Sequence, residues 1–285
     1  MYKNNKIFNE AVNFNNENLS ANEQLVYEKK VENAKIGKIN EKDFIDVYHE
    51  SEINNDLETI NKIKQSPGFS PRHDKAIILE KILSEQIEMS AWLGDCVAIE
   101  TSEYDDIKNQ TDFVIEINNS DNEPLKFAID VKVTDDYKII KEKADKIINK
   151  LKHNKGAEIK YFESELSNAK GKIDCLPHVL VVLNTLNFRN LCDLVADNIN
   201  GQISKKDLAN EPYQFVIIEE IIDQLQKQID YYKENHIGKL EKSKIYNNLI
   251  KIKNKISEIN ENKLKHGNLK DPRVGLDSVI KVNFS

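Results

Sequence analysis

Apolar and polar positions alternate strictly in two neighbouring stretches near the middle of the chain. Residues 111–117 carry Phe113, Ile115 and Ile117 at every second position, and residues 127–133 repeat the pattern from Phe127 onward. A period of two is typical of a half-buried β-strand. The polar run Asn118–Glu123 between them has the composition of a turn. The pattern therefore predicts a β-hairpin.

Helical spacing and short apolar runs flank this hairpin on both sides. They predict a helix over 76–93, a short strand over 96–99, an amphipathic helix over 136–151, a strand buried on both faces over 179–183 and a helix over 188–196. The order is helix, three strands, helix, strand. It predicts an α/β fold built around a small mixed sheet.

Composition changes at both ends of this region. Residues 1–70 are rich in Asn, Lys and Glu and predict a helical appendage, with helices over 41–49 and 57–63 and a capping box formed by Ser20 and Glu23. The Pro- and Gly-containing stretch 66–71 marks the boundary. We therefore expect a core over 71–213. A C-terminal extension over 214–285 has two long helical patterns separated by Gly238, which predict a helical hairpin.

Charge and composition narrow the class of protein. With 41 Lys and Arg against 48 Asp and Glu, the net charge of −7 argues against a protein that coats nucleic acid by bulk charge. The three cysteines form no C-x-x-C pair and the six histidines no helical pair, which disfavours a zinc site. No apolar run could span a bilayer and no signal peptide is evident, so we expect a cytoplasmic protein without a membrane partner.

Candidate chemistry is concentrated in the predicted hairpin. Asp130 and Lys132 are two apart on one strand and therefore share a face, and Asp112 begins the other strand. In a suitable register the two aspartates become neighbours, and two adjacent carboxylates repel each other unless a cation neutralises them. Hard oxygen ligands favour Mg²⁺ or Mn²⁺. The alternative is a charged hairpin face that is simply solvated.

A further carboxylate lies on the apolar side of the helix predicted over 76–93. Glu80 falls on the same side as Ala76, Leu83 and Ile87, and a buried carboxylate needs a partner or a metal ion. It could instead cap a neighbouring loop at the start of the helix. Glu85 and Glu88 on the same helix are alternatives for a functional role.

These residues together resemble the PD-(D/E)xK nuclease superfamily. The likeness runs from about Asp74 to Ala196 and comprises Glu80 on the first helix, Asp112 on the second strand and Asp130-x-Lys132 on the third. The segment Tyr104-Asp105-Asp106 through Asp112 is similar to one found in some members, although Gln110 stands where they often have glycine. The resemblance implies a restriction-endonuclease-like αβββαβ core with a mixed sheet.

The same resemblance implies a metal-dependent nuclease that hydrolyses phosphodiester bonds, most readily in DNA. Asp112, Asp130 and Glu80 would hold Mg²⁺ or Mn²⁺, and Lys132 would orient water or stabilise charge on the phosphate. Asp106 and Glu116 are candidates for supporting the ligands, and Asp105 for structuring its loop. Lys138, Lys141 and Lys146 are candidate nucleic-acid contacts on the following helix.

Two other interpretations stay open at this stage. The chain could be a catalytically inactive module of the same fold that binds nucleic acid or protein. The C-terminal helices could clamp nucleic acid or form a homodimer. No G-x-S-x-G, Walker A or H-E-x-x-H pattern is present, which disfavours a serine hydrolase, a P-loop nucleotide hydrolase and a zinc protease.

Overall fold

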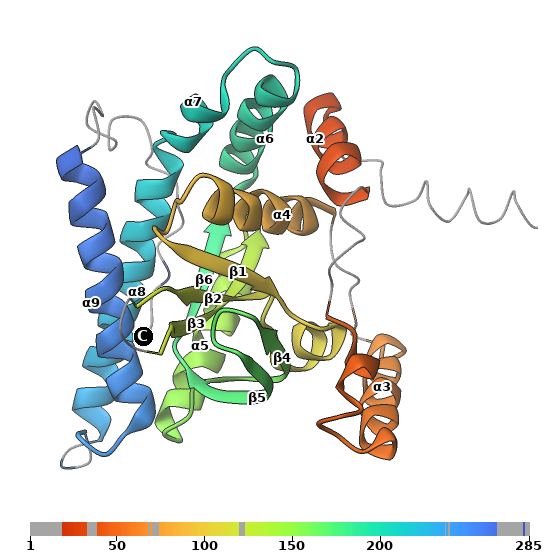
Figure 1. Cartoon of the computed structure of the whole chain (residues 1–285), viewed down its shortest axis with the longest axis vertical. Helices are drawn as coiled ribbons and strands as arrows, with labels where there is room; N and C mark the ends of the chain where they lie inside the picture. Colours follow the sequence, from red (N-terminus) through yellow and green to blue (C-terminus); the bar gives the residue numbers. More distant parts are fainter. Residues whose placement is uncertain are drawn as a thin grey trace, which may run out of the picture.

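The computed structural model describes residues 19–32, 39–67, 69, 74–119, 123–236, 238, 240–266 and 282. The protein is a mixed α/β fold with helices around a central sheet (Figure 1). The sheet has the strand order β1-β2-β3-β6, in which β1, β2 and β3 are antiparallel neighbours and β6 runs parallel to β3. The strands are β1 (Cys96–Glu100), β2 (Phe113–Ile117), β3 (Leu125–Val133) and β6 (His178–Leu183).

The β2–β3 hairpin forms in the register that places its alternating residues on separate faces. Phe113 pairs with Ile129 and Ile115 with Phe127, and all four join the main hydrophobic core. Helix α4 (Asp74–Met89) packs over this face against β1 and β3. Alternation in the sequence thus predicted which residues of the hairpin enter the core, as observed.

The opposite face of the hairpin is covered as well, and the expectation of a solvated polar face is wrong. A second, two-stranded sheet of β4 (Ala157–Ser164) and β5 (Ala169–Leu176) buries Val114 and Ala128 against Ile159 and Phe162. All five residues of β2 are buried as a result. The sequence pattern did not predict this hairpin, because register shifts interrupt its pairing and charged side chains alternate along its outer face.

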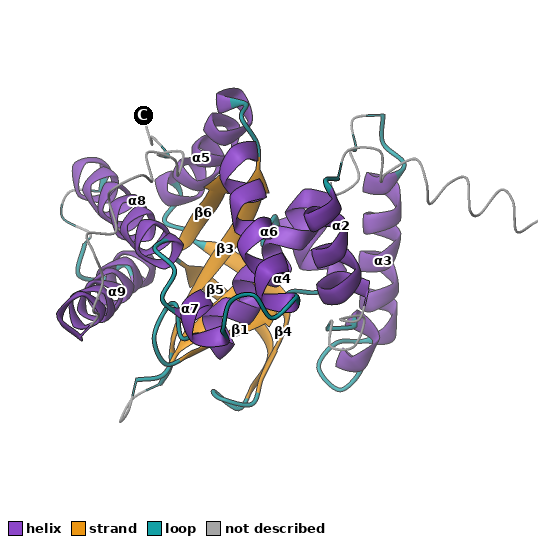
Figure 2. Cartoon of the chain, turned by 90° about the horizontal axis from the view of Figure 1, so that it is seen from above, coloured by secondary structure: helices purple, strands orange, loops and turns teal. Residues whose placement is uncertain are grey.

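Helix α5 (Tyr137–Lys152) connects β3 to the small hairpin. Together with α6 (Thr185–Ile199) it completes the layers, and Figure 2 shows α5 on one side of β3 and β6 with α4 and α6 on the other. The buried residues of α5 are spaced at three and four positions, as Ile140, Ala144, Ile147 and Leu151, which is the stripe expected of an amphipathic helix. The short α7 (Lys205–Ala209) follows α6.

The two long C-terminal helices pack against each other and cover the β6 edge. They are α8 (Tyr213–Asn235) and α9 (Lys244–His266). The Gln224 side chain accepts a hydrogen bond from the Leu180 N–H at 2.9 Å and donates one to its carbonyl at 2.7 Å. The Gln228 amide donates to the His178 carbonyl at 2.8 Å. Side chains of α8 therefore satisfy backbone groups that an edge strand would expose.

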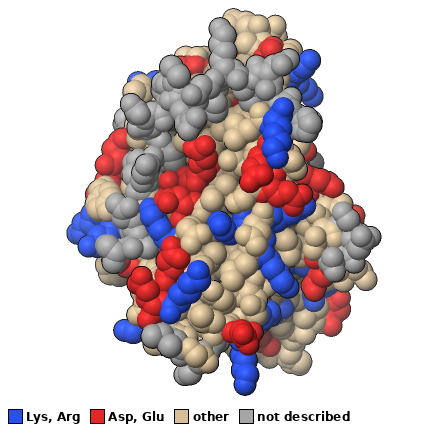
Figure 3. Space-filling model, turned by 90° about the vertical axis from the view of Figure 1, so that its left-hand side faces the viewer, with Lys and Arg blue, Asp and Glu red and all other residues tan. Residues whose placement is uncertain are grey.

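The apolar stripes of α8 and α9 are buried within the same chain. Ile221 and Leu225 of α8 and Leu249 and Ile252 of α9 belong to the same core as the sheet. Figure 3 views the outer face that these helices form, where basic and acidic side chains are interspersed. Among the described residues of the two helices, Leu264 is the one large apolar side chain that is mostly exposed. No helix in the described part of the chain is long and apolar enough to cross a bilayer.

The N-terminal region is helical but differs in detail from the sequence prediction. Ser20 and Glu23 form the predicted capping box at α2 (Ala21–Val26), which continues as a π-helical turn, Tyr27–Val31. The helix predicted over 41–49 is only a 3₁₀ turn, Glu41–Phe44. The following helix α3 runs over Glu50–Lys64, starting earlier than predicted, because the His49 side chain accepts the Ser51 N–H and caps it.

Candidate functional site

The hairpin register brings Asp112 and Asp130 to the same end of the sheet. Phe113 pairs with Ile129, so one step further along places Asp112 opposite Asp130. The Asp112 N–H donates to the Ile129 carbonyl at 2.9 Å, and its Oδ2 accepts the Val131 N–H at 2.6 Å. Asp112 therefore begins β2 with its carboxylate held against the backbone of β3.

Two lysines bind the Asp130 carboxylate. Lys132 Nζ lies 3.0 Å from Oδ1, and Lys143 Nζ of α5 lies 2.6 Å from Oδ2. Asp130 is only 1% exposed. Burial alone would raise its pKa, but the two ammonium groups outweigh burial and hold the pKa of this carboxyl well below its usual value. The carboxylate is therefore ionised at neutral pH.

The predicted carboxylates act on the charge of Lys132. Burial would lower its pKa, yet the charges of Asp130, Asp112 and Glu80 raise it above the usual value for lysine. Asp130 therefore contacts the Lys132 ammonium group directly, and Asp112 and Glu80 lie near enough for their charges to act on it. The structure brings together the four residues that the sequence singled out as catalytic.

The remaining carboxylates of α4 point elsewhere. Glu85 pairs with Lys30 at 2.6 Å, and Glu88 accepts the Ala98 N–H at 3.1 Å on the outer edge of β1. Glu80 is buried, at 9% exposure, beside the β2–β3 end of the sheet. It is the helix carboxylate that the structure groups with Asp112 and Asp130.

A cavity of about 580 Å³ opens beside this group. Its walls come from the end of α3, the start of α4, the segment before β2, and α5. The charged or polar residues of the lining that matter here are Glu80, Asp106, Gln110, Asp112 and Lys143. Apolar side chains such as Ile77 and Phe113 form part of the wall, and further polar and charged side chains, among them Lys81 and Glu100, complete it. A cleft that combines apolar surface with convergent polar groups is the usual form of a ligand site.

The segment before β2 forms a π-helical turn over Asp105–Asn109. Asp105 fastens it, accepting hydrogen bonds from Asn109 Nδ2 at 2.6 Å and from the backbone N–H groups of Lys160 and Tyr161 at 2.8 and 2.9 Å. The expectation that Asp105 structures its loop is confirmed. Gln110 then adopts a left-handed φ of 58°, a conformation that favours glycine.

Asp106 and Glu116, the two candidates for supporting the ligands, are in different places. Asp106 lines the 580 Å³ cavity with Glu80 and Asp112. Glu116 is four residues along β2 from Asp112, about 13 Å away, and is fully buried. It accepts hydrogen bonds from Ser164 and Ser167 and pairs with Lys126 at 3.2 Å. Glu116 therefore anchors the β4–β5 turn.

The predicted nucleic-acid contacts lie on α5 at unequal distance from the site. Lys138 and Lys141 are exposed, and Lys138 faces Glu142 at 4.0 Å. Lys146 donates to Gln110 Oε1 at 3.2 Å, beside the cavity. Lys143, which binds Asp130, is not among the nucleic-acid contacts predicted from the sequence. Its position between Ile140 and Ile147 on the buried stripe is the signal that could have identified it.

The donor set is suited in kind to a hard divalent cation, since its atoms are carboxylate oxygens. Among the described residues, however, no three His, Cys, Asp or Glu side chains are arranged so as to hold a metal ion. The ammonium groups of Lys132 and Lys143 provide the physical reason, because they bind both oxygens of Asp130. A divalent cation would have to take over part of the role that they fill.

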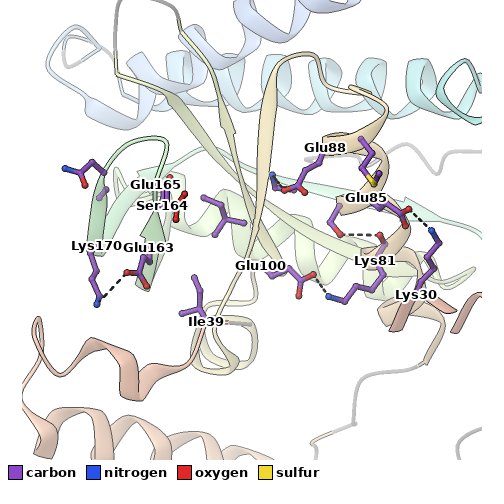
Figure 4. Close-up of a pocket in the computed structure, with 16 residues that line it drawn as sticks. Lys30, Ile39, Lys81, Glu85, Glu88, Glu100, Glu163, Ser164, Glu165 and Lys170 are labelled. Carbon is purple, nitrogen blue, oxygen red and sulfur yellow. Dashed lines mark hydrogen bonds and ion pairs between the residues drawn. The ribbon is translucent and has the colours of Figure 1, made fainter. Parts of the chain in front are cut away.

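A larger cavity, of about 780 Å³, runs along the β1 edge and shares Lys81 and Glu100 with the 580 Å³ cavity. Figure 4 shows that its charges occur mainly as neutralising pairs: Lys30 with Glu85, Lys81 with Glu100, and Lys170 with Glu163. These ion pairs join separate elements and stabilise the walls. Among the described residues of this lining we find no cluster of carboxylates around a lysine like the one at Asp112 and Asp130. We therefore place the candidate site at the smaller cavity beside Asp112.

Comparison with known proteins adds no relative to this picture. No protein-family model, curated protein sequence or solved structure matches the chain.

Proposed function

We propose that the protein is a metal-dependent nuclease that hydrolyses phosphodiester bonds in DNA, with a PD-(D/E)xK core formed by α4, β1, β2, β3, α5 and β6. One observation carries the proposal: Asp112 lies opposite Asp130 at one end of the sheet, Asp130 contacts Lys132, and Asp112 and Glu80 line one cavity and act on the charge of Lys132. The element order and the parallel β3–β6 pair support the αβββαβ core.

Asp112, Asp130 and Glu80 would hold Mg²⁺ or Mn²⁺. When bound, such an ion polarises a phosphate oxygen and lowers the pKa of water. Lys132 stays protonated at neutral pH because three carboxylates raise its pKa, so it acts as a cation and not as a base. Its task is then to donate to an oxygen of the scissile phosphate, where negative charge increases during hydrolysis.

The surroundings of these residues suit a polyanionic substrate despite the net charge of −7. Lys146 lies beside Lys143 on α5 and donates to Gln110 at the edge of the 580 Å³ cavity, which would receive the reacting group. The exposed Lys138 and Lys141 lie on the outer side of the same helix. Fixed lysines on one helix can follow a phosphate backbone even in an acidic protein. Binding to DNA is accordingly expected to weaken steeply as salt is added.

Calorimetry with Mn²⁺ and cleavage of plasmid and single-stranded DNA test the proposal together. The wild type should bind the ion and cut DNA, and Asp112→Asn and Glu80→Gln should each lower the cutting rate by about 10²-fold or more. Glu85→Gln is the matched control, because that carboxylate lies on the same helix but pairs with Lys30. It should cut like the wild type.

The same experiment separates the enzyme from a catalytically inactive module. A wild type that binds DNA but neither binds Mn²⁺ nor cuts would reject the nuclease and favour the binding module. Equal losses in the Glu80 and Glu85 variants would reject the assignment of the site. A wild type that cuts only with a divalent ion present, with the loss confined to the site variants, would establish the proposed function.

A further inference from the structure

A second, smaller cavity of about 230 Å³ adjoins the candidate site on the side of β6 and α5. The residues that matter in its lining are Gln110, Asp130, Lys143, Lys146, Lys150 and His178. Gln110 and Lys143 also line the 580 Å³ cavity, so the two spaces are neighbours. The proposed nuclease site accounts for Asp130, Lys143 and Lys146 of this lining and leaves Lys150 and His178 unexplained.

His178 is buried in the wall of this cavity, and its ring nitrogens lack hydrogen-bond partners among the described residues. It is the first residue of β6 and pairs with Ala128, so its side chain shares the face of Asp130 two residues along. It is 5% exposed, and the Gln110 backbone lies close enough to act on its pKa. Burial and the charge of Lys150 lower the pKa of His178 to about 3, so the ring is neutral and offers one N–H.

Lys150 is a partly buried cation without a counter-ion. It follows Lys143 by two helical turns on the same side of α5, and it makes no ion pair with any described carboxylate. Burial, the largest effect, lowers its pKa below the ordinary value for lysine. Asp130, the one carboxylate in the lining, is already bound by Lys132 and Lys143. The group as a whole therefore has an excess of positive charge.

An unsatisfied imidazole and an unpaired ammonium group beside one cavity both cost free energy unless something binds there. The missing partner must be anionic, must accept several hydrogen bonds and must be compact. A phosphate group meets each requirement, and lysine binds phosphate as a point charge. About 230 Å³ leaves ample room for it, because a water molecule takes about 30 Å³ of liquid.

We propose that this cavity binds a second phosphate group of the substrate strand, next to the phosphate that is cut. Lys150, Lys146 and His178 would hold it. The proposal rests on the proposed function for the position of the cut. His178 lies on β6 level with Ala128, two residues or about 7 Å along the strand direction from the level of Asp130. The phosphate is either an internal diester or a terminal monoester of the substrate strand. No bond is made or broken in this cavity.

Binding without a divalent ion tests the site independently of cleavage. The probes are a 5′-phosphorylated single-stranded oligonucleotide, the same strand with a 5′-hydroxyl, and inorganic phosphate, each titrated calorimetrically in EDTA. Lys150→Met should weaken oligonucleotide binding about tenfold and reduce its salt dependence by about one phosphate contact, and Lys150→Arg should restore it. Lys152→Met, an exposed residue of the same helix, is the matched control and should change affinity less than about twofold.

Comparing the three probes distinguishes a terminal phosphate from an internal one. Tighter binding of the phosphorylated strand by the wild type, lost in Lys150→Met, assigns the cavity to a terminal monoester. Equal binding of both strands, weakened equally by Lys150→Met, assigns it to an internal diester. Inorganic phosphate should bind weakly to the wild type and more weakly to the variant.

Thermal unfolding without ligand gives a second readout. Lys150→Met should unfold at a higher temperature than the wild type, because it removes a buried charge that lacks a counter-ion. If Lys150 had only a structural role, its replacement by Met would lower the unfolding temperature. Unchanged affinity for both oligonucleotides in Lys150→Met, with cutting intact, overturns the phosphate site and leaves the nuclease standing. Weakened affinity in a protein that never cuts supports the phosphate site while rejecting the nuclease.

Discussion

Asp105 and Asp130 are two buried aspartates of the same region held in opposite ways. Asp105 accepts hydrogen bonds from Ser102, Asn109 and the backbone N–H groups of Lys160 and Tyr161, all of them neutral donors. Asp130 is bound by the ammonium groups of Lys132 and Lys143. Burial raises the pKa of Asp105 despite its donors, whereas the two lysines lower the pKa of Asp130.

The difference separates a structural acid from one available for chemistry. The donors of Asp105 belong to backbone and short side chains, which cannot move away without unfolding the turn. The donors of Asp130 end long flexible side chains, so another cation can take their place. The type of donor, more than burial, therefore indicates which buried carboxylate can exchange its partner.

The largest effect on stability is expected from Asp105→Ala. It leaves three N–H groups and a hydroxyl without their acceptor inside the protein, which should lower the free energy of unfolding by about 4 kcal/mol. Urea denaturation measures the loss. Glu103→Gln, a half-exposed neighbour paired with Lys64, is the matched control and should cost less than about 0.5 kcal/mol. Equal losses of unfolding free energy in the two variants would show that Asp105 is not a structural acid.

A pH-dependent effect of about 3 kcal/mol is expected from Glu220, a buried acid of α8. Burial raises its pKa to about 7, against hydrogen bonds from the Val282 N–H and the Gln224 amide. Between pH 4.5 and pH 7 the folded state holds a proton that the unfolded state releases, so the free energy of unfolding falls as pH rises. Glu220→Gln should flatten this decline in denaturation curves collected from pH 4 to pH 8. A parallel decline in both proteins would assign it to other groups.

The smallest effect on stability is expected from Asp130→Asn, about 2 kcal/mol, because Lys143 loses its buried carboxylate partner while Lys132 keeps Asp112 and Glu80 nearby. The loss should be complete above pH 3.8 and disappear as pH falls below it, since the folded pKa is the lower one. The same variant should lose Mn²⁺ binding in calorimetry. A destabilisation as large as that of Asp105→Ala would show that Asp130 is a structural acid too.

The sequence predicted the parts of the site that lie in regular, alternating strands. Strict alternation in 111–117 and 127–133 set the hairpin register, and the register alone placed Asp112 opposite Asp130. Helical spacing likewise identified Glu80 on the apolar side of α4. Local patterns of this kind need no knowledge of distant residues.

Features that depend on distant contacts could not be predicted. The β4–β5 hairpin is interrupted by register shifts, so its alternation is broken, and the burial of Glu116 depends on Ser164 and Ser167 of that hairpin. The role of His178 depends on α5 crossing beside β6, which the residues around His178 do not indicate.

The β4–β5 hairpin is bound at two places, to the turn before β2 and to β2 itself. Midway along β4, the backbone of Lys160 and Tyr161 donates to Asp105, and near the hairpin turn Ser164 and Ser167 donate to Glu116. Lifting the hairpin away from β2 must break both sets of bonds and expose Val114 and Ala128 together. The amides of β4 and β5 should therefore exchange with deuterium as one cooperative unit, and the loop that carries Asp106 and Gln110 should become protected and unprotected with them, while β2 stays protected by its pairing with β1 and β3.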